Sequence, residues 1–138
     1  MIAIVKSEFN SKITNGLLSG CLDALKNQGF KDKDIYLKKV PGAFEIPAMV
    51  KKVIKKINPK IVITLGCVIK GETDHYHYIC NAVSNGVMNL TLEFKTPILF
   101  GVLTCQNAQL AYNRSGENMD KNKGYELGNS VKLLLDKI

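Results

Sequence analysis

The sequence lacks the features that mark several large classes of protein. No apolar stretch approaches the ~20 residues of a membrane-spanning helix. No basic stretch precedes the apolar start of the chain, and Lys6-Ser7-Glu8 cuts this start short, so we expect no secretory signal peptide and no membrane association. Runs of Pro, Ser or Gln, internal repeats and linkers are also missing. The sequence therefore predicts one cytoplasmic domain over residues 1–138.

Cysteine and histidine are few, and their spacing argues against a metal centre. None of the four cysteines forms a C-x-x-C pair, and each lies in an apolar pattern: Cys21, Cys67, Cys80 and Cys105. We predict that they are reduced and buried and act as small hydrophobic side chains. His75 and His77 are two residues apart, which places them on roughly opposite sides of a helix. We expect no metal site and no cofactor, and we interpret His77 as structural.

The formal net charge of +7 allows either a nucleic-acid partner or a lysine-rich surface on a protein that handles anions. Four lysines fall on one side of a predicted helix whose other side is apolar: Lys51, Lys52, Lys55 and Lys56. A surface that binds single-stranded nucleic acid needs aromatic residues among its basic ones, and none alternates with these lysines. The pattern favours a solvated helix face and no nucleic-acid partner.

Four short runs rich in Ile and Val predict strands. They cover residues 2–5, 35–40, 61–69 and 97–104. The third and fourth are apolar almost throughout, which is typical of parallel strands covered on both faces. Helical stripes lie between and after them, at residues 13–25, 46–57, 76–94, 107–114 and 127–138. Ser11 is a plausible cap and Gly29 a plausible stop for the first.

This β-α-β-α-β-α-β-α-α order predicts an α/β fold, a flavodoxin-like three-layer α/β/α sandwich around a four-stranded parallel sheet. Such sheets bind ligands outside the carboxyl ends of their strands. Aromatic, glycine and ionisable residues gather at those ends. They are Phe9-Asn10 after the first strand, Gly42-Ala43-Phe44-Glu45 after the second, and Lys70 to His75 after the third.

The segment from Lys70 to His75 leads into a helix. The first N–H groups of a helix suit an anion such as phosphate, and Thr73 can add a hydroxyl while Lys70 adds charge. Thr73 or Asp74 before a helix is more often an ordinary N-cap. His75 can transfer protons near neutral pH, although a surface or packing histidine is the other interpretation.

The other candidates also have two interpretations. The turn from Gly42 to Glu45 could bind a polyol chain, or it could be a simple loop with Phe44 in the core. Phe9 could stack on a flat heterocycle or belong to the core. Arg114 could bind phosphate with both arms of its guanidinium, or it could be a surface arginine at a helix end.

Five motifs in order make the chain similar to a known family. They are Val40-Pro41-Gly42-Ala43-Phe44-Glu45-Ile46-Pro47, Gly71-Glu72-Thr73-Asp74-His75-Tyr76, Phe100-Gly101-Val102-Leu103-Thr104, Arg114-Ser115-Gly116 and Asn122-Lys123-Gly124. Together with Phe9-Asn10, they resemble the lumazine synthases over nearly the whole chain. The resemblance implies a transferase of riboflavin biosynthesis without a cofactor. It would condense 5-amino-6-(D-ribitylamino)uracil with 3,4-dihydroxy-2-butanone 4-phosphate to 6,7-dimethyl-8-ribityllumazine, releasing phosphate and water.

The resemblance also implies site residues. Phe9, within Phe9-Asn10, would stack on the pyrimidine, and the ribityl chain would contact Gly42, Ala43, Phe44 and Glu45. Val68 and Ile69 would contact the pyrimidine through their backbone, with Lys70 beside them. The butanone phosphate would be bound by Gly71, Glu72 and Thr73, and His75 would transfer protons. Phe100, Arg114 and Lys123 would reach the site from a neighbouring subunit, with Arg114 on the phosphate.

Some positions depart from the family pattern. Glu8 stands where a basic residue is common, Lys70 replaces an arginine and loses its planar fork, and His77 replaces an acidic residue. The stretch between Arg114 and Lys123 is one residue longer than usual. The family assembles as homopentamers, and some members form a sixty-subunit icosahedral shell that can enclose riboflavin synthase. The short N-terminus and the longer turn argue for a pentamer rather than a shell.

Three other functions remain open from the sequence. An archaeal-type riboflavin synthase shares the fold but dismutates lumazine, and Gly71 to Thr73 with His75 argue against it. A non-catalytic flavin- or lumazine-binding or shell protein would bind the heterocycle without turnover, and His75 and Arg114 argue against that. A basic nucleic-acid binder would show affinity that falls steeply with salt, and no recognition motif for one is present.

Overall fold

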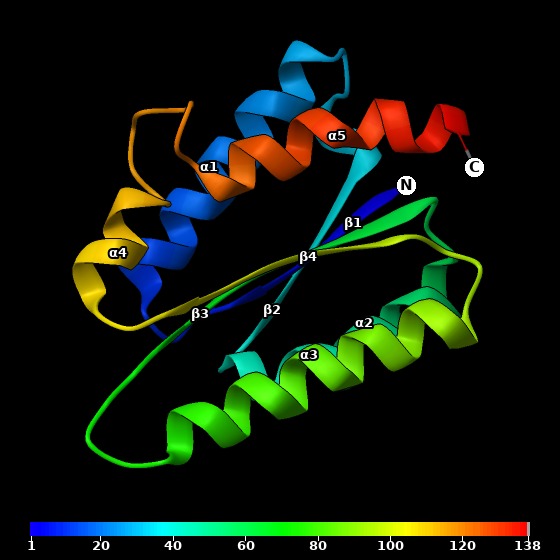
Figure 1. The fold of residues 1–138 in the computed structure, drawn as a ribbon. Coiled ribbons are helices and arrows are strands. Elements are labelled where there is room, and N and C mark those ends of the chain that lie inside the picture. Colours follow the sequence, from blue (N-terminus) through cyan, green and yellow to red (C-terminus); the bar gives the residue numbers. More distant parts are fainter. Residues whose placement is uncertain (138) are drawn as a thin grey trace.

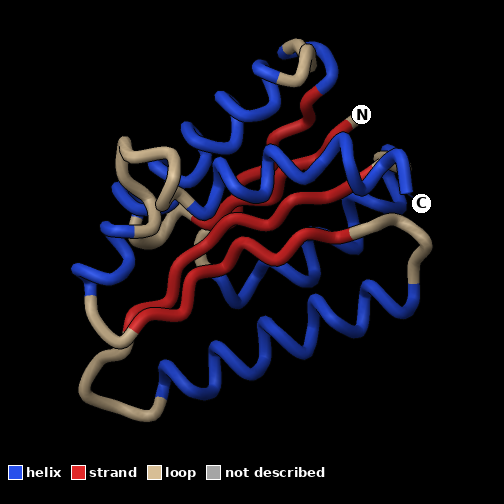
Figure 2. The backbone as a smooth tube through the Cα atoms, turned by 45° about the horizontal axis from the view of Figure 1, so that its top comes forward, coloured by secondary structure: helices blue, strands red, loops and turns tan. Residues whose placement is uncertain are grey.

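The computed structural model describes residues 1–137, so Ile138, the last residue of the final predicted stripe, lies outside the described residues. The chain folds into a parallel sheet between two layers of helices (Figures 1 and 2). The strands are β1 (Ile2–Ser7), β2 (Ile35–Val40), β3 (Ile61–Ile69) and β4 (Ile98–Cys105). The predicted α/β sandwich is confirmed, and the strand ends differ from the predicted ones by at most two residues.

The strand order of the sheet is β2-β1-β3-β4, and each neighbouring pair is parallel. The chain first places β2 on one side of β1 and then crosses to place β3 on the other side. The order therefore reverses between β1 and β3. In sheets of this kind a crevice opens at that point, outside the carboxyl ends of the two strands.

Two cores lie on opposite faces of the sheet, because alternate residues of a strand point to opposite sides. The helices α1 (Ser11–Asn27) and α5 (Lys123–Lys137) cover one face, and α2 (Ile46–Ile57) and α3 (His75–Glu93) cover the other (Figure 1). The short α4 (Ala108–Asn113) lies on the side of α1. On β1, Ile2 and Ile4 belong to the first core, and Ala3 and Val5 to the second.

The helices follow the predicted stripes, with one correction at the start of α1. Ser11 is the first residue of the helix rather than its cap. The capping position is Asn10, which has a left-handed backbone (φ 61°, ψ 49°) and no side-chain capping bond. Gly29 follows the end of α1 with φ 94°, and its N–H bonds to the carbonyl of Lys26, which confirms it as the stop.

Glycines allow α1 and α5 to pack with their backbones close together. A Cβ atom on Gly124 would lie 2.7 Å from the carbonyl carbon of Leu17, and one on Gly128 would lie 2.8 Å from the carbonyl oxygen of Cys21. Side chains on Gly16 and Gly20 would meet the segment that precedes α5. We call these four glycines the glycine seam. The apolar stripes indicated the two helices but not this close approach.

The cysteine prediction is confirmed for three residues. All four are free thiols, and Cys21, Cys67 and Cys105 are buried, whereas Cys80 is only partly buried. The predicted lysine face of α2 is largely exposed, and Lys51 forms an ion pair of 3.2 Å with Glu93. In residues 1–137, no helix is long and apolar enough to cross a membrane.

Candidate active site

A cleft of about 590 Å³ lies at the carboxyl ends of the strands, where the strand order reverses. Of the sixteen predicted site residues, eleven line it: Phe9, Asn10, Gly42, Ala43, Phe44, Glu45, Val68, Ile69, Gly71, Thr73 and His75. Five do not: Lys70, Glu72, Phe100, Arg114 and Lys123. Three further lining residues were missed by the sequence analysis: Cys67, Tyr76 and Ile79.

Phe9 and the turn after β2 are tied together by the backbone. The N–H of Glu8 bonds to the carbonyl of Val40 at 2.8 Å, and the N–H of Phe9 bonds to the carbonyl of Pro41 at 2.9 Å. These bonds extend the pairing of β1 with β2 beyond the sheet. The Phe9 side chain is 71% exposed, so it belongs to the rim of the cleft and not to the core.

The acidic residue at position 8 has a buried partner. Lys6 has a side chain only 1% exposed, and its ammonium nitrogen lies 3.2 Å from Glu8 Oε1. A buried ammonium without a carboxylate is strongly unfavourable, so Glu8 offsets the charge that this chain buries at Lys6.

Asn10 joins the ends of β1 and β3. Its side-chain Nδ2 donates to the carbonyl of Cys67 at 3.1 Å. Its own carbonyl accepts from the N–H groups of Ile13 and Thr14 at 3.0 Å, which begins α1. Asparagine tolerates the left-handed backbone better than most residues, so it suits this abrupt turn from strand to helix.

The turn after β2 presents both a carboxylate and an aromatic ring to the cleft. Residues Ala43–Glu45 form a 3₁₀ turn, and Glu45 Oε1 accepts from the N–H of Gly42 at 2.9 Å. This bond holds the carboxylate at the cleft. Phe44 is 57% exposed and lines the cleft, so the alternative that it belongs to the core is wrong.

The loop after β3 brings Gly71, Thr73 and His75 to the other side of the cleft. Its start is fixed by a bond of 2.9 Å from the N–H of Lys70 to the carbonyl of Cys105. Thr73 Oγ1 accepts from the N–H of His75 at 3.3 Å, while the side chain of Asp74 makes no capping bond. The Thr73 hydroxyl can still donate its hydrogen to an anion in the cleft.

Three cleft residues escaped the sequence analysis because they share apolar patterns with the core. Cys67 comes directly before Val68 on β3, and Tyr76 and Ile79 belong to the apolar stripe of α3. Burial, and to a lesser degree the neighbouring Cys105, raises the pKa of the Cys67 thiol to about 12. Cys67 is therefore protonated at neutral pH and suits contact rather than nucleophilic attack.

His77 is absent from the lining of the cleft. It is exposed, and its ring meets the ring of Tyr76 edge-on with centroids 5.2 Å apart. In the described part of the chain, no group of three or more His, Cys, Asp or Glu side chains is placed to hold a metal ion.

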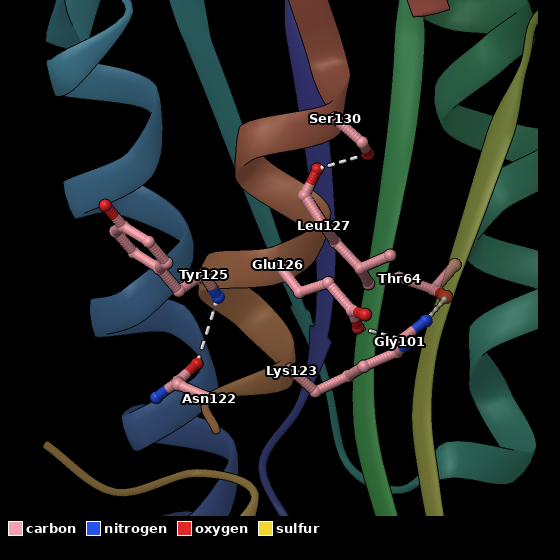
Figure 3. A network of polar contacts seen from close by, with 8 residues as sticks. All are labelled: Thr64, Gly101, Asn122, Lys123, Tyr125, Glu126, Leu127 and Ser130. Atoms are coloured by element: carbon pink, nitrogen blue, oxygen red, sulfur yellow. Dashed lines mark hydrogen bonds and ion pairs between the residues drawn. The ribbon is translucent and has the colours of Figure 1, made fainter. Parts of the chain in front are cut away.

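Arg114 and Lys123 lie next to each other, away from the cleft of their own chain. The N–H of Lys123 bonds to the carbonyl of Arg114 at 2.8 Å, although nine positions separate them. Arg114 follows the last residue of α4, as the surface interpretation expected, and Lys123 begins α5. The ammonium of Lys123 lies 2.6 Å from Glu126 Oε2 (Figure 3).

Phe100 occupies the edge strand β4, and its side chain is 37% exposed. The hydroxyl of Thr64, inside β3, donates to the carbonyl of Leu99 at 2.8 Å. It also accepts from the N–H of Gly101 at 3.1 Å, a bond drawn in Figure 3. These bonds fix the backbone on both sides of Phe100. The ring is therefore presented from a rigid strand.

Comparison with known proteins shows which family this chain resembles. The sequence profile described as 6,7-dimethyl-8-ribityllumazine synthase matches residues 1–137. The chain belongs to the lumazine synthase family. A 6,7-dimethyl-8-ribityllumazine synthase from Desulfosudis oleivorans is 46% identical over 114 residues, which cover 83% of this chain and 73% of that protein. The strand-end cleft is thus found in a chain that matches lumazine synthases along its described length.

Proposed function

We propose that this chain is a 6,7-dimethyl-8-ribityllumazine synthase, a transferase that acts in riboflavin biosynthesis. The observation that carries the proposal is the cleft where the strand order reverses, which combines an exposed ring, a carboxylate, a hydroxyl and a histidine. The family match over residues 1–137 supports one domain with this activity. Both substrates are small polar molecules, which suits a cytoplasmic enzyme.

The two sides of the cleft suit the two substrates. On one side, Phe9 can stack on the pyrimidine and Glu45 can accept hydrogen bonds from ribityl hydroxyls, with Gly42 to Phe44 beside the chain. Val68 and Ile69, at the end of β3, offer backbone groups to the heterocycle. On the other side, Gly71 and Thr73 can bind the phosphate of the butanone, with Glu72 and Lys70 in the same loop.

His75 lines the cleft on the side of Gly71 and Thr73 and can move protons in the reaction. The amine of the pyrimidine attacks the ketone and loses water to form an imine. Phosphate then leaves, the second nitrogen closes the ring, and water is lost. Each step moves a proton on or off nitrogen, oxygen or carbon, which an exposed imidazole can assist. Holding both reactants in one cleft supplies much of the remaining rate.

The proposed site is completed by a neighbouring subunit. Phe100, Arg114 and Lys123 lie outside the cleft of their own chain, and in a homopentamer they would reach the next cleft, with Arg114 on the phosphate. Exposed apolar side chains support self-association, since Met88 and Leu92 on α3 and Leu110 on α4 are 57%, 80% and 45% exposed. Light scattering should give five times the 15.3 kDa of one chain. A shell, with riboflavin synthase as its partner, would give a much larger mass.

Turnover of the purified protein tests the proposal. Wild type mixed with both substrates should form lumazine above the uncatalysed background. His75→Ala should slow this by roughly tenfold or more, whereas His77→Ala, two residues along the same helix but outside the cleft, should not. Arg114→Ala should raise the KM for the butanone phosphate, with Lys121→Ala as the control for loss of an exposed charge.

Two results would contradict the proposal. Binding of the ribityl heterocycle without turnover would indicate a non-catalytic binding or shell protein. Dismutation of lumazine would indicate an archaeal-type riboflavin synthase. Equal activity of His75→Ala and His77→Ala would leave the enzyme in place but remove His75 from its mechanism.

A further inference from the structure

We propose that Asn122 is a positioning residue that fixes Arg114 and Lys123 for the phosphate of the butanone substrate. The inference rests on the proposed function, in which these two cations complete a neighbouring cleft. Asn122 contacts no substrate in this scheme. It acts through the backbone of the segment that carries the two cations.

The Asn122 side chain is buried and bonds to three separate parts of the chain. The residue is 1% exposed. Its Nδ2 donates to the carbonyl of Gly16 in α1 at 3.1 Å and to the carbonyl of Gly116 at 2.9 Å. Its Oδ1 accepts from the N–H of Tyr125 at 3.0 Å and thereby caps α5 (Figure 3). One amide group therefore connects the first helix, the loop after α4 and the last helix.

These bonds hold the backbone at Arg114 and directly after it. The Arg114 carbonyl accepts from Lys123, which directly follows Asn122, and the Gly116 carbonyl accepts from Asn122 itself. Between them Ser115 is buried, and its hydroxyl donates to the carbonyl of Ala111 at 2.9 Å. Movement of Arg114 would break several of these bonds together.

The glycine seam makes room for this arrangement. A Cβ atom on Gly20 would lie 2.6 Å from Asn122 Cγ, and one on Gly16 would overlap the carbonyl group of Ser115. Two α1 glycines thus lie against the buried amide and the segment that it holds. Because ordinary contacts begin near ~3.4 Å, larger residues would displace this segment.

An asparagine meets the requirements of this position, whereas an aspartate meets only some of them. The carboxylate of Asn122→Asp could still cap α5, because an N-cap needs only an acceptor. It could not donate to the carbonyls of Gly16 and Gly116, and its charge would lie against these two acceptors. The substitution therefore separates positioning of the loop from capping of the helix.

The experiment compares Asn122→Asp with Asn107→Asp in the assembled wild-type enzyme and in the Arg114→Ala variant. Asn107 caps α4 through its Oδ1 at 3.0 Å and is exposed, so Asn107→Asp is the matched control. Because misplacement by about 1 Å can cost ~10²-fold, Asn122→Asp should raise the KM for the butanone phosphate about tenfold or more. The KM for the pyrimidine should change less than about threefold, because its side of the cleft is untouched.

The Arg114→Ala background distinguishes positioning from general damage. If Asn122 acts through Arg114, Asn122→Asp should raise the KM of Arg114→Ala by a smaller factor than that of wild type, because one of the two cations that it positions is already gone. The inference would be overturned if Asn122→Asp raised the KM of Arg114→Ala by the same factor as it raises that of wild type. An unchanged KM in Asn122→Asp, in an enzyme where Arg114→Ala does raise it, would also overturn the inference and leave the proposed function intact.

A second variant covers the case in which Asn122→Asp does not fold. Gly20→Ala adds a methyl group against the Asn122 side chain, while alanine itself favours the helix more than glycine does. It should raise the same KM in a folded protein. Normal kinetics in Gly20→Ala would contradict the inference. Wild type that makes no lumazine would instead refute the proposed function and remove the basis of the inference.

Discussion

Gly124→Ala tests whether the glycine seam limits the stability of the fold. Gly124 lies in the first turn of α5, directly after Lys123, and faces Leu17 of α1. An added Cβ atom would be 2.7 Å from the carbonyl carbon and 2.9 Å from the Cα of Leu17. Both atoms belong to the backbone of a helix, so no side chain can turn aside to make room.

The expected loss follows from two opposing effects. Relief of the overlap requires the two helices to separate by about 1 Å, since ordinary contacts begin near ~3.4 Å, and such overpacking costs about 1–3 kcal/mol or more. Backbone contact places this case at the upper end. Alanine favours the helix by at most about 1 kcal/mol. The free energy of unfolding should therefore fall by about 2 kcal/mol, and Tm by about 5–10 °C.

Thermal unfolding at one fixed protein concentration measures the change, because self-association would make Tm depend on concentration. Gly86→Ala in α3 is the matched control. Its added Cβ atom would meet the ring carbons of Pro47, at 2.9 and 3.0 Å, and not the main chain of a neighbouring helix. Its Tm should change by no more than a few degrees. A Gly124→Ala protein as stable as wild type would refute the close approach of α1 and α5.

Three further predictions concern the cleft and the buried thiols. Phe9→Ala should raise the KM for the pyrimidine with little change in Tm, because stacking on a ring is worth about 1–3 kcal/mol and this side chain is 71% exposed. Glu45→Ala should raise the same KM roughly tenfold, because it removes both the carboxylate and its bond to Gly42, whereas an unchanged KM would place the ribityl chain elsewhere. Burial raises the pKa values of Cys21 and Cys67 from 9.0 to about 12. Between these pH values the folded protein keeps thiol protons that the unfolded chain releases. The free energy of unfolding should therefore be highest below pH ~9 and fall as the pH rises toward ~12. Urea titrations at alkaline pH that show no such fall would contradict this prediction.

The sheet could be predicted well because its strands carry a strong signal. Ile61 to Ile69 is apolar on both faces, and only a parallel strand covered by two helix layers accounts for that in an α/β pattern. The end of β1 was harder to predict from the sequence. Lys6 interrupts the apolar run at the start of the chain, yet it lies inside the strand and is buried, because Glu8 supplies its carboxylate. The sequence does not show that these two residues pair.

The cleft could be predicted to the extent that it lies at strand ends. The rule for parallel sheets led to Phe9, Glu45 and His75 and left two interpretations open for each, and the family resemblance favoured the functional one. Asn10 as the start of α1 was missed, because a left-handed residue without a capping bond leaves no pattern. The partnership of Arg114 with Lys123 was also missed as a structural feature, since it depends on a backbone bond across a loop.

The glycine seam also has a consequence for synthesis of the protein on the ribosome. Asn122 bonds to Gly16 across 106 positions, and Gln28 bonds to Gly128 across 100. The groove that the glycines leave on α1 is made early but receives its partner only when the last helix emerges from the exit tunnel. Until then α1 covers its face of the nascent sheet without α5, and the side of α1 that packs against α5 stays open. The final fifteen residues of the described chain, which form α5, therefore complete the packing around α1, the first helix of the chain.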